Sequence, residues 1–132
     1  LLANQYYPIA GPCTEMCLLE TAAQAITDTA SGRELLSGSA AAKGVVMDKT
    51  TGMEARIMGN AAYSTAGMKI SDVNDVLNKL IPLYEAHYTD APAGKTFAEC
   101  YDPLTVRPTK EYLEVYDKAV ATLAECGFEM KD

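Results

Sequence analysis

The chain has 132 residues, and its 11 basic and 18 acidic side chains give it a net charge of −7. This length suits one domain, and 48% apolar with 22% charged residues indicates a folded chain rather than a disordered one. The acidic balance, the lack of an apolar run of about 20 residues and the lack of a leader segment disfavour nucleic-acid-binding, membrane-spanning and secreted proteins.

A short strand and a helix are the first predicted elements. Asn4–Tyr7 is rich in strand-forming residues, and the strand is expected to end at Pro8. Gly11 is the expected N-cap of the helix and Pro12 its first residue, the position that proline tolerates best. Ser31-Gly32 ends the helix. Its apolar residues follow at alternating spacings of three and four: Met16, Leu19, Ala23, Ile26 and Ala30.

A second strand and a second helix follow. Arg33–Ala40 is short and apolar with glycines on both sides, which favours a strand over a continued helix. Thr51 and Glu54 form a capping box at the start of the next helix, and Gly67 ends that helix. Residues 1–67 are therefore expected to run strand, helix, strand, helix, the order of α/β proteins.

The rest of the chain is predicted to be almost entirely helical. Ser71 is the expected N-cap of a third helix, and Pro82 is expected to end it near Leu80. Residues 89–108 contain three prolines and are predicted to form a long irregular connection. Thr109 opens the last helix.

The four cysteines are Cys13, Cys17, Cys100 and Cys126. Cys13 and Cys17 are four residues apart and are expected on one face of a helix. The chain has no CxxC motif and a single histidine, His87, so no metal site is expected. The spacing resembles no small disulfide-bonded scaffold, so we expect buried free thiols in a reducing cytoplasm.

Gln5 and Tyr7 are the candidate functional residues. The common phosphate, hydrolase and zinc-protease motifs are absent, and so is the DxHxxG typical of cobalamin-carrying domains. Alternate residues of a strand point the same way, so an amide and a phenol would share one face and bind a small polar ligand. In the alternative reading, Tyr7 packs against the next helix and Gln5 satisfies backbone groups.

Seven longer runs carry a family resemblance. They are NQYYP at 4–8, AGPCTEMCLLE at 10–20, ITDTASGRE at 26–34, AKGVV at 42–46, DKTTGMEAR at 48–56, APAGKTF at 91–97 and ECYD at 99–102. Together they resemble the C-terminal part of the monomethylamine methyltransferases of methanogenic archaea. The resemblance covers nearly the whole chain. The related dimethylamine and trimethylamine enzymes are weaker alternatives.

The resemblance implies that this chain is part of an enzyme with an α/β fold. Residues 1–67 would be the last two βα units of a TIM barrel, and residues 68–132 a helical C-terminal extension that includes the irregular connection 89–108. The chain by itself is expected to be predominantly α-helical, with one or two short strands. It opens on Leu1 rather than Met, which we interpret as the middle of a longer enzyme. Two strands cannot close a barrel, so a homo-oligomer is expected.

The resemblance also implies methyl transfer in methanogenesis from methylamines. In the family, an upstream pyrrolysine captures monomethylamine through an electrophilic imine, and the methyl group passes to the Co(I) corrinoid of a cognate carrier protein. By match to the NQYYP segment, Gln5 and Tyr7 orient the pyrrolysine ring or the bound ammonium group, a positioning and electrostatic role.

The resemblance places the pyrrolysine outside this chain. No catalytic residue, metal or cofactor is therefore expected on these residues, and the chain alone is expected to be inactive. The competing hypothesis is a free-standing acidic helical module that binds another protein and performs no catalysis.

Overall fold

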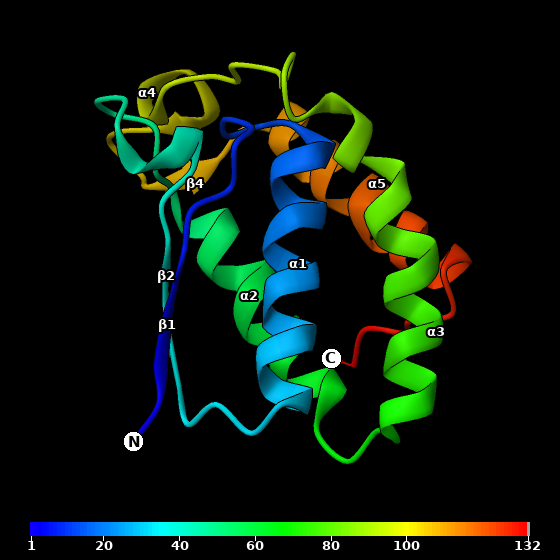
Figure 1. Ribbon diagram of the computed structural model, residues 1–132. Coiled ribbons are helices and arrows are strands. Elements are labelled where there is room, and N and C mark those ends of the chain that lie inside the picture. Colours follow the sequence, from blue (N-terminus) through cyan, green and yellow to red (C-terminus); the bar gives the residue numbers. More distant parts are fainter. Residues whose placement is uncertain (132) are drawn as a thin grey trace.

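Two parallel strands and two helices form the first half of the fold in the computed structural model, which describes residues 1–131 (Figure 1). Strands β1 (Ala3–Tyr6) and β2 (Leu35–Ser39) pair side by side. Helix α1 (Glu15–Ala30) connects them, and α2 (Gly52–Thr65) packs along α1. The predicted order of strand, helix, strand, helix is confirmed.

The second half is helical, with one departure from prediction. Helix α3 and helix α5 both pack on α1. The segment 89–108, predicted to be irregular throughout, contains a short helix and a pair of two-residue antiparallel strands. In chain order the elements are α3 (Ile70–Leu80), 3-10 turns at Ile81–Leu83 and Glu85–His87, α4 (Phe97–Cys100), β3 (Tyr101–Asp102), β4 (Arg107–Pro108) and α5 (Lys110–Glu125). Within residues 1–131, no helix is both long and apolar enough to cross a membrane.

Helix α1 begins later than predicted. Thr14 is its N-cap, and the Thr14 hydroxyl accepts a hydrogen bond from the Cys17 amide at 3.3 Å. A threonine hydroxyl can satisfy an orphan amide of the first turn, which Gly11 has no side chain to do. Cys13 therefore lies before the helix, with a φ of 61°, and the prediction that it shares a helix face with Cys17 is wrong.

The starts of α2 and α5 agree with the prediction, and the start of α3 does not. Thr51 and Thr109 are the N-caps of α2 and α5, as predicted. Helix α3 instead has Lys69 as its N-cap, and the amide of Val73 donates to the Lys69 carbonyl at 3.1 Å. Ser71 is thus inside the first turn rather than at the cap. The end of α3 at residue 80 agrees with the prediction made from the downstream proline.

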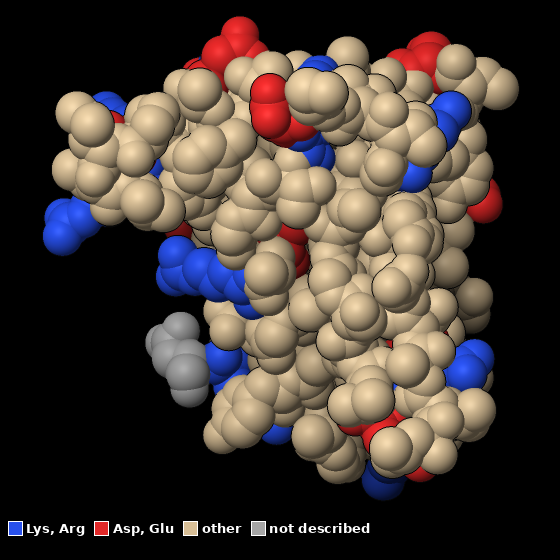
Figure 2. Space-filling model, turned by 90° about the vertical axis from the view of Figure 1, so that its left-hand side faces the viewer, with Lys and Arg blue, Asp and Glu red and all other residues tan. Residues whose placement is uncertain are grey.

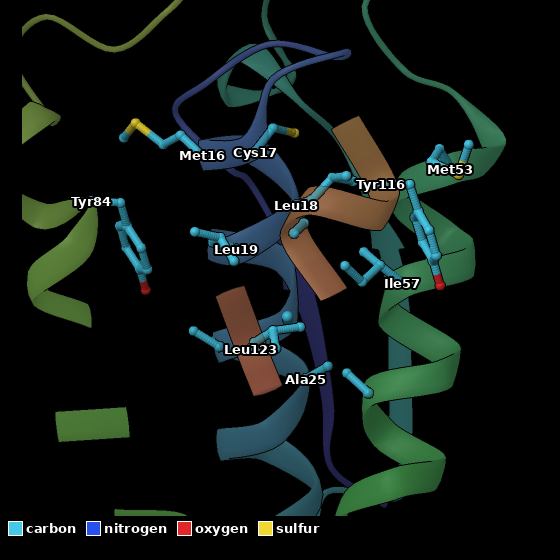
Figure 3. Packing of buried hydrophobic residues seen from close by; sticks show 14 of the residues in the cluster. Met16, Cys17, Leu18, Leu19, Ala25, Met53, Ile57, Tyr84, Tyr116 and Leu123 are labelled. Carbon is cyan, nitrogen blue, oxygen red and sulfur yellow. The ribbon is translucent and has the colours of Figure 1, made fainter. Parts of the chain in front are cut away.

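One hydrophobic core joins β1, β2 and helices α1, α2, α3 and α5. Figure 3 shows Leu18 of α1, Ile57 of α2 and Leu123 of α5 in this core, and each is fully buried. Tyr84, which follows α3, and Phe128, which follows α5, also belong to this core. The same core therefore crosses residue 67, where the sequence suggested a boundary.

The four cysteines are all free and buried, as predicted. Burial raises the pKa of every one of these thiols, that of Cys100 to about 12. Because the thiolate is the reactive form, we expect no cysteine of the native protein to react with a disulfide reagent at about pH 7.5. All four are expected to react once guanidinium chloride unfolds the chain. Rapid release of one equivalent of reporter thiol from the native protein would contradict this prediction.

Candidate functional site

The β1–β2 sheet has one covered face and one open face. On the covered face, Tyr6 is buried and the side-chain amide of Asn4 donates to Asp28 of α1 at 2.6 Å. Gln5 and Tyr7 are exposed on the opposite face, as strand alternation predicts. Figure 2 looks onto this side of the molecule, and uncharged residues make up most of its right-hand half.

Gln5 and Tyr7 contact each other. The Tyr7 hydroxyl donates a hydrogen bond to the Gln5 side-chain oxygen. The Gln5 amide N–H groups and the remaining lone pairs of the phenol oxygen are therefore available to a further partner. The Tyr7 side chain is 51% exposed, so the reading in which it is buried against the next helix is wrong.

A cavity of about 190 Å³ lies beside this pair, on the open face of the sheet. Both strands and the loops at their carboxyl ends line it: Gln5, Tyr6, Tyr7, Ser37, Gly38, Ser39, Ala40 and Thr50. Ligands of parallel α/β sheets bind at this end of the strands. The lining offers hydroxyl, phenol and amide groups rather than charges, which suits a small polar molecule.

Ser37 of β2 is a third polar side chain at the cavity, and a bulge follows it. Gln5 is paired with Ser37 in regular register, but the next residue of β1 is paired with Ser39, so Gly38 is left over with a φ of 49°. Ser37 is exposed beside Gln5, whereas the bulge turns Ser39 to the covered face, where it is buried and hydrogen-bonded to Thr21 of α1. Bulges are frequent next to active sites because they re-aim side chains. Sequence reasoning missed Ser37; the glycine between the two serines was the only signal.

Buried Glu20 holds the loop that follows Tyr7. This residue of α1 accepts hydrogen bonds from the backbone amides of Ile9 at 2.8 Å and Ala10 at 3.1 Å. Burial raises the pKa of the Glu20 carboxyl, and the two backbone hydrogen bonds oppose that rise. Glu20 thereby ties the carboxyl end of β1 to α1.

A left-handed turn after β2 holds the same loop from the other side. Ala42, Lys43 and Gly44 have φ values of 53°, 62° and 67°. This conformation costs a non-glycine residue about 1–2 kcal/mol. Hydrogen bonds to the loop keep the turn in place: the Ala42 amide donates to the Ala10 carbonyl at 3.0 Å, and the Lys43 amide to the Pro8 carbonyl at 2.8 Å. Sequence reasoning gave these three residues no structural role.

A third segment, residues 92–94, packs against this end of the sheet. The amide of Gly11 donates to the carbonyl of Pro92 at 2.9 Å, and the Lys49 ammonium donates to the Gly94 carbonyl at 3.0 Å. A Cβ atom on Gly11 would lie 1.8 Å from the Ala93 carbonyl oxygen, so only glycine fits.

The single histidine lies away from the cavity. His87 is in an exposed 3-10 turn, and its Nδ1 atom is 3.4 Å from a carboxylate oxygen of Asp90. In the described part of the chain, no group of three or more histidine, cysteine or acidic side chains is arranged to hold a metal ion.

Parallel strands joined by a crossover helix, with a cavity at their carboxyl ends, define an α/β protein of the kind that binds small ligands at that end. The family model described as "Monomethylamine methyltransferase MtmB" matches residues 1–128. The chain belongs to this family, which confirms the family resemblance of the sequence.

Relatives of known sequence and structure support the same family assignment. Monomethylamine methyltransferases of Methanosarcina mazei and Methanosarcina barkeri are 69% and 68% identical over 127 residues. The crystal structure of the Methanosarcina barkeri enzyme matches with a TM-score of 0.95 at 67% identity, covering 97% of this chain, and so does the crystal structure of a hydroxylamine complex of MtmB. The chain spans 28% of the length of these relatives.

Proposed function

We propose that this chain is the part of a monomethylamine methyltransferase that positions the reacting amine. The observation that carries the proposal is the hydrogen-bonded pair of Gln5 and Tyr7, exposed beside a small cavity at the carboxyl end of β1. The names of the relatives support methylamine as the substrate. The hydroxylamine complex of one relative supports a site for small amines.

The proposed setting of this pair is the interior of a TIM barrel. In that arrangement, residues 1–67 supply the last two βα units, and residues 68–132 form an extension packed on the outer side of α1. The open face of the sheet supports this arrangement, because a barrel would enclose that face and pair the free edges of β1 and β2. Without that enclosure, the same edges would favour self-association into a homo-oligomer.

The proposed chemistry divides between this chain and groups outside it. An upstream pyrrolysine would hold the amine, and the corrinoid of a cognate carrier protein, as Co(I), would supply the nucleophile that accepts the methyl group. The residues of this chain do not fit a corrinoid site, because the single histidine lies in an exposed turn beside Asp90. The chain would work in the cytoplasm as part of methanogenesis from methylamines.

Within that division, Gln5 and Tyr7 act as orienting groups. The phenol oxygen of Tyr7 accepts a hydrogen bond from the N–H of the bound ammonium group, and the Gln5 carboxamide donates to an acceptor on the pyrrolysine ring. Neither residue is a nucleophile. Fixed dipoles of this kind act by positioning and by stabilising charge as it shifts in the transition state.

A chimeric enzyme tests the proposal. This chain replaces the matching segment of the Methanosarcina barkeri methyltransferase, and methylamine-dependent methylation of the corrinoid protein is measured. Gln5→Ala is expected to lower kcat/KM by about 100-fold and Tyr7→Phe by about tenfold. The 132-residue chain alone is the negative control, because it lacks the pyrrolysine.

Tyr63→Phe is the matched control, because Tyr63 is an exposed tyrosine of α2 and does not line the cavity. It is expected to retain activity. If Gln5→Ala and Tyr7→Phe both retain the activity of the unmodified chimera, the proposed role is wrong. That result is also what the interaction-module hypothesis predicts.

A further inference from the structure

The backbone on both sides of Tyr7 is held by the segment that follows β2. The amide of Ala40 donates to the carbonyl of Tyr6 at 2.8 Å, and the amide of Lys43 donates to the carbonyl of Pro8 at 2.8 Å. The residue between these two carbonyls is Tyr7. Its main chain is therefore fixed, and only the side-chain torsions of Tyr7 remain to be set.

The ring of Tyr7 lies directly against the backbone of Gly44. A Cβ atom on Gly44 would be 2.9 Å from the Tyr7 Cδ1 atom and 3.0 Å from its Cε1 atom. It would also lie 3.2 Å from the Cβ atom of Ala40. These separations are shorter than van der Waals contact, so the ring occupies the space that any other residue at position 44 would need. The φ of 67° at Gly44 independently favours glycine.

We infer that Gly44 is a positioning residue that sets the side-chain rotamer of Tyr7. A half-exposed tyrosine in a strand commonly samples more than one χ1 rotamer. Contact with Gly44 on one side of the ring and the hydrogen bond to Gln5 at its hydroxyl leave the rotamer that points the phenol along the cavity. The consequence for catalysis rests on the proposed function, whereas the contact itself does not.

The first test observes the Tyr7 ring in the 132-residue chain. All eight tyrosines are replaced by 3-fluorotyrosine, and the ¹⁹F signal of Tyr7 is assigned as the one that Tyr7→Phe removes. Gly44→Ala is expected to shift or broaden this signal and leave the others in place. The control is Gly32→Ala: Gly32 has a similar φ of 77°, but a Cβ atom there would meet no heavy atom within 4 Å.

Two outcomes of this test would overturn the inference. One is a Tyr7 signal that Gly44→Ala and Gly32→Ala leave equally unchanged. The other concerns folding: if Gly44→Ala does not fold, the double variant Gly44→Ala with Tyr7→Ala is expected to fold, because the ring that blocks the new methyl group is gone. A double variant that stays unfolded while Gly32→Ala folds shows that the ring contact is not what makes glycine necessary.

The second test measures catalysis in the chimeric methyltransferase. Gly44→Ala is expected to lower kcat about tenfold with little change in KM, because a misplaced phenol affects the transition state more than ground-state binding. Gly32→Ala is expected to change kcat less than about twofold. An unchanged kcat in Gly44→Ala, when Tyr7→Phe lowers activity, overturns the inference. If Tyr7→Phe itself retains full activity, the role proposed for Tyr7 fails, while the ¹⁹F result still decides the contact.

Discussion

Replacing Leu18 by alanine is expected to lower the free energy of unfolding by about 2–5 kcal/mol. Leu18 is 0% exposed and lies in the first turn of α1, the helix against which α2, α3 and α5 all pack. Leucine and alanine have similar helix propensities, so the cost comes from lost contacts and from the cavity that remains. Against a total stability of about 5–15 kcal/mol for a typical domain, this loss is large.

Guanidinium chloride unfolding followed by far-UV circular dichroism measures this effect. Leu104→Ala is the matched control, because Leu104 is 94% exposed in the turn between β3 and β4. It is expected to change the free energy of unfolding by no more than about 0.5 kcal/mol. Equal losses in the two variants would mean that α1 is not at the centre of the folded core.

Glu54 is expected to make the protein less stable as the pH rises above the acid range. It is 0% exposed in the first turn of α2, and one of its carboxylate oxygens has no hydrogen-bond partner among the described residues. Burial raises the pKa of Glu54, and the hydrogen bond from the Thr51 hydroxyl opposes the rise. The native state therefore binds the Glu54 proton more tightly than the unfolded state does.

The sign of the pH dependence follows from this difference. Between 4.5, the pKa of an unperturbed glutamate, and the higher native pKa of Glu54, the native state binds more protons than the unfolded state. Stability consequently falls as the pH rises through this interval, by up to about 1.4 kcal/mol per pH unit. Glu20, whose pKa is also raised by burial, adds to the fall.

Other carboxyls act in a separate pH interval. Hydrogen bonds lower the pKa of Glu34, Glu99 and Asp102, so their contributions to stability are lost only as the pH falls below the ordinary values of 4.5 and 3.8. Below these values the three hydrogen-bonded carboxyls decide the slope, and above them the buried glutamates do.

Glu54→Gln tests this assignment, because glutamine has the shape of glutamic acid and does not ionise. Free energies of unfolding measured between about pH 4 and pH 8 are expected to fall more gently for Glu54→Gln than for the unmodified chain. Glu114→Gln, at an exposed position of α5, is expected to leave the slope unchanged. Parallel curves for Glu54→Gln and the unmodified chain would show that Glu54 does not hold a proton in the native state.

The sequence by itself determined most helix boundaries, the order of strands and helices over residues 1–67, and the family. Periodicity, threonine N-caps and terminating glycines act within a few residues, so Thr51, Thr109 and Pro82 predicted helix ends that the structure confirms. Strand alternation is equally local, and it correctly placed Gln5 and Tyr7 on one face.

Only the tertiary structure decided the features that depend on segments distant in sequence. Only glycine fits at position 11, because this residue packs on Ala93, about 80 residues away along the chain. Capping by Glu54 was predicted, but its burial was not, because burial depends on which helices cover it. Ser37 and Gly44 likewise reach Gln5 and Tyr7 only through the pairing of two strands joined by a helix. Local propensity carries no information about such contacts, since the free energy that fixes them arises when the segments meet.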